Sequence, residues 1–116
     1  MTKSLSIKTT DKIQHVIKPP LSMAKQAAAG LKLHNQFKRG GTEVGLKRAR
    51  DLKEQKELTA TDIKKIYSYF ARHTVDKQSA MFTDKENPSN GYIAWLLWGG
   101  DAGEKWINKE RKKLEF

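Results

Sequence analysis

Apolar residues recur in this chain at helical spacing, and short polar segments that suit helix ends separate the apolar stretches. The clearest stretch follows Thr59, where the apolar positions are three or four residues apart: Ile63, Ile66, Tyr67 and Phe70. Residues with this spacing lie on one face of a helix. Thr59 and Asp62 also have the spacing of a capping box, which closes the first turn of a helix. The pattern therefore predicts a helix that begins near residue 60 and continues to Arg72 or beyond.

Two further helices are predicted before this one. The pair Pro19–Pro20 breaks the chain, and because proline fits the first turn of a helix, a helix is expected from about this point. Its apolar face is formed by Ala24, Ala27, Ala28 and Leu31. The pair Gly40–Gly41 is expected to supply the left-handed conformation that ends the helix. Thr42 then caps a second predicted helix over residues 43–55.

The C-terminal part of the chain contains its most aromatic stretch. Residues 88–106 hold all three tryptophans and four of the eight glycines. The apolar run from Tyr92 to Trp98 predicts a helix that starts near Ser89 and stops at Gly99–Gly100, where paired glycines favour a tight turn. Asp101 is expected to be the N-cap of a last helix.

Two segments have weaker patterns. Residues 1–18 fit either a basic N-terminal arm or a short hairpin that turns at Thr9–Lys12. Residues 76–90 are predicted to form a loop that Met81 or Phe82 anchors to the rest of the domain. The chain is thus expected to comprise an arm, residues 1–18, followed by a single helical domain, residues 19–116.

These segments together predict an all-α fold, a compact bundle of four or five short helices with a core rich in tryptophan. The predicted core residues are Tyr67, Phe70, Trp95, Trp98 and Trp106. The tryptophans have the spacing of core positions among other apolar residues, and stacking on nucleic-acid bases is the less favoured alternative.

Positive charge is concentrated in the first third of the chain. The whole sequence has a net charge of +10. Residues 1–41 contain eight basic residues and one acidic residue, whereas the other 75 residues contain 15 basic and 12 acidic ones. Such an excess favours contact with a polyanion through neutralisation of phosphates, although it can also serve solubility alone. The predicted DNA-contacting residues are Lys25, Lys32, Lys38, Arg39, Lys47 and Arg48.

The second and third predicted helices invite comparison with a helix-turn-helix motif, because only a few residues join them. The exposed face of the third helix would carry Lys64, Lys65 and Ser68. Lysines suit phosphates better than base edges, so the expected binding is independent of base sequence. Gly41–Thr42, at the start of the second helix, is either a phosphate-binding turn or a plain helix connection.

Several other kinds of site are not indicated. Cysteine is absent, which excludes disulfides and thiolate ligands. His15, His34 and His73 lack the spacing of a metal site, and no glycine-rich loop has the ending of a P-loop. No apolar run reaches the roughly 18–20 residues that span a bilayer. We therefore expect no metal, no cofactor and no membrane contact.

A few polar residues fit either a catalytic or a structural role. The candidates for acid–base or phosphate chemistry are Arg72, His73 and Asp76, near the end of the third predicted helix. In the structural alternative, Arg50 and Asp51 form salt bridges between helix ends, while His73 and Asp101 cap helix termini. The structural alternative is favoured, and so is a protein without enzymatic activity.

Four segments, taken in order, resemble a small domain of poorly defined function found in tailed bacteriophages and prophages. They are Pro19–Pro20 with Ala28–Leu31, Arg39–Leu52, Tyr69–His73 with Asp76–Lys77, and Pro88–Gly103. That family occurs alone or appended to phage head proteins, including prohead-maturation proteases. The resemblance implies a capsid-associated protein located in the virion or the host cytoplasm. The family pattern retains Arg50, Asp51, Arg72, His73 and Asp101.

The sequence leaves three functions open. The first is a small non-enzymatic phage protein of the head or its assembly that contacts duplex DNA electrostatically and without sequence specificity. The second is a protein–protein interaction module that binds a capsid protein or a host factor. The third is a small phosphate-processing enzyme such as a nuclease, for which Arg72, His73 and Asp76 are the candidate residues.

Overall fold

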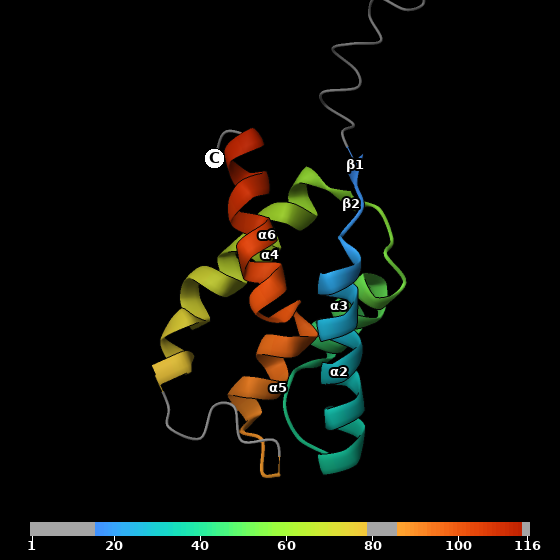
Figure 1. Cartoon of the computed structure of the whole chain (residues 1–116), viewed down its shortest axis with the longest axis vertical. Coiled ribbons are helices and arrows are strands. Elements are labelled where there is room, and N and C mark those ends of the chain that lie inside the picture. The colour runs from blue at the N-terminus through green and yellow to red at the C-terminus, as the bar shows by residue number, and fades with distance from the viewer. Residues whose placement is uncertain (1–15, 79–85, 115–116) are drawn as a thin grey trace, which may run out of the picture.

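The computed structural model describes residues 16–78 and 86–114, and in this part of the chain it is built from five α-helices (Figure 1). The helices are α2 (Leu21–Phe37), α3 (Glu43–Lys53), α4 (Ala60–His73), α5 (Asn90–Leu97) and α6 (Gly100–Lys113). A short 3-10 helix, η1 (Thr74–Gln78), continues from α4. The predicted all-α fold is confirmed. The predicted loop anchors Met81 and Phe82 lie outside the described residues.

Local capping chemistry sets three of the helix starts, as predicted. The hydroxyl of Thr42 accepts a hydrogen bond from the N–H of Gly45 at 3.1 Å, and Ser89 caps α5 in the same way through the N–H of Tyr92. Thr59 and Asp62 form a reciprocal capping box at the start of α4. Each cap satisfies backbone donors that the first turn of a helix leaves unpaired.

The predicted left-handed cap at the end of α2 is wrong. The left-handed residue that ends α2 is Lys38, with φ 55° and ψ 41°. Its N–H donates the last hydrogen bond of the helix, to the carbonyl of His34. Gly40 and Gly41, with φ of 83° and 81°, instead let the chain pass directly over α5. A Cβ atom at Gly40 would lie 2.6 Å from the Cβ of Ile93.

Asp101 is not the N-cap of the last helix. Gly99, with φ 122°, occupies that position, and α6 already begins at Gly100, with φ 64°. Both glycines have positive φ angles, which glycine adopts without a steric penalty, and they turn the chain sharply between α5 and α6. Asp101 therefore lies in the first turn of α6, where its carboxylate is available for contacts with other elements.

A short two-stranded sheet ties the beginning of the described chain to the connection between α3 and α4. The strands β1 (Val16–Ile17) and β2 (Leu58–Thr59) pair antiparallel, with Ile17 opposite Leu58. The pairing partner of β1 is therefore remote in sequence. The hairpin turn suggested at Thr9–Lys12, like most of the suggested basic arm, lies outside the described residues.

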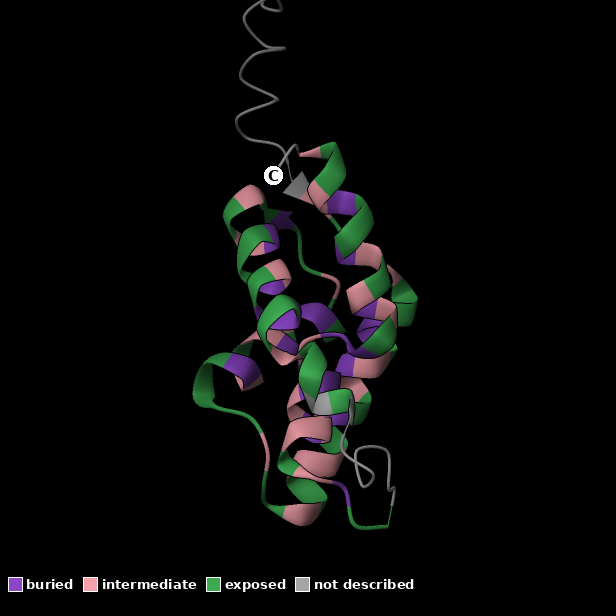
Figure 2. Ribbon diagram, turned by 90° about the vertical axis from the view of Figure 1, so that its left-hand side faces the viewer, coloured by how far each residue is buried: buried purple, intermediate pink, exposed green. Residues whose placement is uncertain are grey.

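The buried residues, purple in Figure 2, are distributed over all five helices, and their side chains form one hydrophobic cluster. Trp95 is 1% exposed and packs edge-on against Phe70, with ring centroids 4.8 Å apart. Tyr69 and Trp98 stack at 4.7 Å, and Tyr69 is buried although the sequence pattern did not place it in the core. Tyr67, Trp98 and Trp106 are partly buried and pack against this cluster.

Candidate nucleic-acid interface

An open groove of about 830 Å³ lies where the start of α3, one face of α4 and the start of α5 meet. Gly40, Gly41, Thr42 and Val44 line it at the start of α3. The first two turns of α5 contribute small residues, and Trp98 follows at the C-terminal end of α5. Helix α4 contributes a row of polar and basic side chains. The size falls within the range of about 300–1,000 Å³ that is usual for ligand sites in proteins.

The α4 side of the groove is one continuous face of the helix. Its residues are Thr61, Lys64, Lys65, Ser68 and Arg72, together with the neighbouring Tyr69 and His73. Their spacing of three, four, seven and eleven residues brings them to the same side of α4. This face alternates hydroxyl groups with positive charges along roughly three helical turns.

The groove is positively charged because Lys64, Lys65 and Arg72 line it and none of its described lining residues is acidic. Lys65 and Arg72 are exposed and form no ion pair within residues 16–78 and 86–114. The carboxylate of Asp62, on the same helix, is directed to Arg48 and Thr59 instead. The groove therefore attracts anions.

A stack of three rings forms one side of the groove. The ring of His73 lies 4.4 Å from that of Tyr69, which in turn stacks on Trp98 with an interplanar angle of 7°. The guanidinium carbon of Arg48, on α3, lies 5.7 Å from the centre of the Trp98 ring. Tyr69 and Arg48 therefore both hold the indole of Trp98 in position beside the groove.

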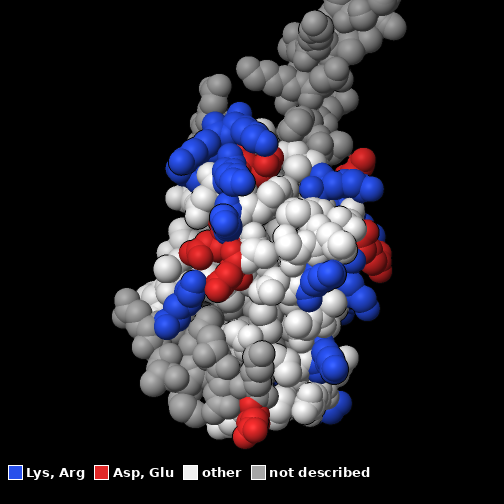
Figure 3. Space-filling model, viewed as in Figure 1, with Lys and Arg blue, Asp and Glu red and all other residues white. Residues whose placement is uncertain are grey.

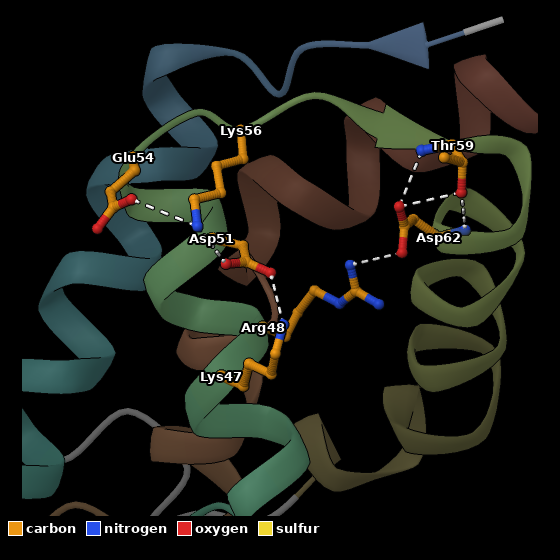
Figure 4. A network of polar contacts seen from close by, with 7 residues as sticks. All are labelled: Lys47, Arg48, Asp51, Glu54, Lys56, Thr59 and Asp62. Carbon is orange, nitrogen blue, oxygen red and sulfur yellow. Dashed lines mark hydrogen bonds and ion pairs between the residues drawn. The ribbon is translucent and has the colours of Figure 1, made fainter. Parts of the chain in front are cut away.

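Arg48 joins α3 to α4. Figure 4 shows its side chain extending from α3 toward Asp62, whose Oδ1 accepts a hydrogen bond from Nη1 of Arg48 at 3.2 Å. The side chain of Arg48 is only 11% exposed. Partial burial alone raises the pKa of Asp62, but hydrogen bonds from Thr59 and the charge of Arg48 outweigh it, and the pKa is lowered.

This pair predicts a stability that depends on pH. Because the folded-state pKa of Asp62 is lowered, its ionised form stabilises the fold above the ordinary Asp value of about 3.9, and this contribution disappears as the pH falls through the folded-state pKa. We expect Asp62→Asn to lower the free energy of unfolding by about 1–2 kcal/mol at pH 7 and by less at about pH 2. Urea unfolding of both proteins at the two pH values measures the difference.

Glu54→Gln is the matched control for that experiment. Glu54 is exposed and lies 3.8 Å from the ammonium of Lys56, so its replacement is expected to change stability by no more than about 0.5 kcal/mol. An effect of Asp62→Asn that is the same at both pH values would show that the charge of Asp62 contributes nothing to the fold.

A second polar network holds α6 against α5 and η1. Oδ1 of Asp101 accepts a hydrogen bond from the indole N–H of Trp95 at 2.9 Å and lies 3.0 Å from the ammonium of Lys77. Lys77 also lies 3.8 Å from Glu104, whose other oxygen accepts from the hydroxyl of Thr74. Asp101 and Lys77 therefore fix the packing of α6 and lie outside the groove.

The predicted DNA-contacting residues divide into two groups. Lys25 and Lys32 are exposed on one face of α2, and Lys38 and Arg39 are exposed where α2 ends, just before the groove begins at Gly40. Lys47 has a 74% exposed side chain that pairs with Asp51, whereas Arg48 is engaged with Asp62 as described above. Basic side chains line the side of the molecule on which α2 lies and gather again over the end of α6 (Figure 3).

Arg39 has an additional local role. Its Nη1 donates to Oδ1 of Asn87 at 3.2 Å and to the carbonyl of Pro88 at 3.0 Å. The guanidinium also lies 5.6 Å from the centre of the Phe37 ring. Arg39 thus connects the end of α2 to the segment that leads into α5.

The candidate catalytic residues are only partly brought together. Arg72 and His73 both line the groove, while the side chain of Asp76 lies outside the described residues. Among the residues that the structure describes, no three His, Asp or Glu side chains are grouped as metal ligands. Arg50 is exposed, and Asp51 lies within 3.4 Å of both Lys47 and Lys56. No described helix is both long and apolar enough to cross a membrane.

Comparison with known proteins finds no relatives: no family model, curated protein or solved structure matches this chain. Interpretation of the groove therefore depends on its own residues.

The sequence signal for the groove was incomplete. Lys64, Lys65 and Ser68 stood out as an exposed face, and the structure places them on one side of the groove. For Arg72, the sequence predicts only acid–base or phosphate chemistry, and the structure places it on the same face. The opposite side comes from the start of α3 and from α5 with Trp98, and no local sequence pattern connects these segments to α4. The start of α3 and helix α5 come to lie opposite this face of α4 only when the chain folds.

Proposed function

We propose that this chain is a small non-enzymatic phage protein, associated with the head or its assembly, that contacts duplex DNA through exposed basic side chains. The phage context rests on the resemblance of the four sequence segments. The observation that supports the DNA contact best is the exposure of Lys25, Lys32 and Lys38, which form no ion pair within the described part of the chain.

Exposed lysines of this kind bind phosphates as point charges and displace condensed counterions from the DNA. They carry no bidentate donor pattern that distinguishes one base pair from another. Arg48 has a largely buried side chain that Asp62 and Trp98 hold in place, so it is expected to contribute the least of the six residues to the contact. The binding is therefore electrostatic, sensitive to salt and independent of base sequence.

A triple replacement tests the contact surface. We expect Lys38→Ala, Arg39→Ala and Lys47→Ala together to remove three of about six phosphate contacts. Between 50 and 200 mM salt, the affinity for duplex DNA should then fall about 40-fold in the variant, compared with about 10³-fold in the unmodified protein. Fluorescence anisotropy of a labelled duplex measures both values.

The matched control is Lys105→Ala, Lys109→Ala and Lys112→Ala, which removes the same charge from exposed positions of α6. An equal loss of salt dependence in both triple variants would contradict the assignment of the contact surface. The same samples with Mg²⁺ added, run on a gel, separate binding from cleavage. Degraded DNA, with cleavage lost in His73→Ala, would replace the proposal with the nuclease alternative.

The remaining alternative, a module that binds a capsid or host protein, makes a different prediction. It requires a complex that survives nuclease treatment and a duplex affinity too weak to measure at low salt. Both results together would overturn the DNA proposal.

A further inference from the structure

The groove between α3, α4 and α5 combines basic, hydroxyl and apolar groups, whereas the exposed lysines of α2 offer only positive charge. It is concave, its α4 side carries Lys64, Lys65 and Arg72, and none of its described lining residues is acidic. Hydroxyl groups of Thr61 and Ser68 alternate with these cations along the same helix face. Ammonium, guanidinium and hydroxyl donors at one-turn intervals suit a row of phosphate oxygens.

The side of the groove that faces α4 is largely apolar. Val44, which is 66% exposed, lies at the start of α3, and Ala94 and Trp98 belong to α5 and its end. A purely ionic ligand would leave these apolar surfaces in water. A ligand that has flat apolar groups next to its charges would cover them and gain the free energy of their burial.

We propose that this groove holds a short stretch of single-stranded nucleic acid, with phosphates against α4 and bases against α3 and α5. The inference rests on the proposed contact with nucleic acid and adds a second, separate site to it. A duplex keeps the flat faces of its bases stacked inside a stiff rod, so it cannot lay them against the apolar side of the groove. A single strand is flexible and can place its phosphates and its bases on different surfaces. Proteins that bind single strands use a positively charged groove for the phosphates and apolar side chains for the bases.

The probe is a labelled oligothymidylate of about 12 nucleotides, within the usual range of single-strand site sizes, compared with a duplex of the same length. The groove variant is Lys65→Gln with Arg72→Gln. The matched control is Lys25→Gln with Lys32→Gln, which removes the same charge from exposed positions on α2, outside the groove. Both pairs are exposed, and circular dichroism verifies that each variant is folded.

We expect the groove variant to bind oligothymidylate at least about tenfold more weakly than the unmodified protein, because two charge-assisted contacts are lost. The control variant should lose less than about threefold, because only the general field of the protein is reduced. For the duplex, the order of the two variants should be reversed or the losses should be equal.

A second replacement tests the groove without removing any cation. Val44 is exposed at the rim, so both Val44→Glu and Val44→Gln should fold. The carboxylate should weaken oligothymidylate binding by a further factor of about three or more relative to the amide, because a negative charge on the α3 side repels the phosphates that lie across the groove on α4 and must be desolvated beneath a base. Equal binding by the two variants would overturn the placement of the strand.

Competition experiments separate the strand from other anions. Oligoglutamate or thymidine 5′-phosphate, added at equal charge, should displace oligothymidylate poorly. Displacement by oligoglutamate as effective as by unlabelled strand would assign the groove to an acidic peptide, and equal displacement by thymidine 5′-phosphate would assign it to a free nucleotide. Either result overturns the proposal.

The two proposals fail in different ways. Duplex binding that persists, with the groove and control variants equally impaired toward oligothymidylate, would remove the groove site and leave the proposed DNA contact intact. Absence of binding to both nucleic acids at low salt would remove both.

Discussion

Replacing Trp95 with alanine is expected to lower the free energy of unfolding by about 3–5 kcal/mol, the range for a large aromatic side chain removed from a core. Trp95 is 1% exposed and packs against Phe70 at a centroid distance of 4.8 Å. Its indole N–H donates to Asp101, and the ammonium of Lys77 lies 5.2 Å from the ring centre. The variant would lose the hydrophobic contacts and the polar network that fixes α6 at the same time. Since small domains have only about 5–15 kcal/mol of stability, partial unfolding at room temperature is a realistic outcome.

Urea unfolding followed by circular dichroism measures this loss, because tryptophan fluorescence would itself change. Trp106→Ala is the matched control: Trp106 is only partly buried at the edge of the cluster. Its loss should cost less than half as much. Equal costs for the two replacements would show that Trp95 is not the centre of the core.

Gly30→Ala is expected to destabilise the protein, although the same replacement within an ordinary helix stabilises it by about 1 kcal/mol. Helix α2 crosses α5 at Gly30, and a Cβ atom there would lie 2.7 Å from the backbone nitrogen of Leu97 and 3.0 Å from the Cβ of Leu96. A backbone atom cannot move aside as the end of a side chain can, so the two helices would have to separate. Overpacking of this kind costs about 1–3 kcal/mol.

Ala29→Gly calibrates the contribution of helix propensity at the adjacent, exposed position of α2. It should destabilise by about 0.5–1 kcal/mol through backbone entropy alone. Thermal or urea unfolding of both variants gives the comparison. If Gly30→Ala increased the stability, α2 and α5 could not approach each other as closely as the structure indicates.

The parts of the fold that the sequence predicted correctly depend on signals within a few residues. Thr42, Ser89 and the Thr59–Asp62 pair announce helix starts because each cap bonds to a backbone group two or three residues away. The helical spacing correctly predicted Ile63, Ile66 and Phe70 as buried residues of α4, whereas Tyr67, predicted on the same face, is only partly buried.

The features that the sequence did not reveal depend on packing between remote segments. Asp101 is a residue type that favours N-caps, but α6 begins before it, at Gly100. Its carboxylate contacts Trp95 and Lys77 instead. Arginine is usually a surface residue, yet the side chain of Arg48 is largely buried against Asp62 of α4 and the ring of Trp98. Tyr69 lies beside the predicted stripe of α4 and is buried because α5 brings Trp98 against it.

The candidate groove illustrates the same limit. Net charge directed attention to residues 1–41, whereas Lys64, Lys65 and Arg72 lie in the part of the sequence whose charge is nearly balanced. Acidic residues of that part, such as Asp62 and Asp101, are directed into structural pairs away from the groove. Local charge therefore depends on how ion pairs are arranged in space, and a count along the chain does not provide this arrangement.

The most direct test of the proposed function is the affinity of the unmodified protein for labelled duplex DNA, measured by anisotropy at about 50 and 200 mM salt. About six phosphate contacts predict that the affinity falls roughly 10³-fold between the two concentrations, and equally for duplexes of unrelated sequence. An affinity that is the same at both salt concentrations, or no binding at the lower one, would contradict an electrostatic contact with DNA.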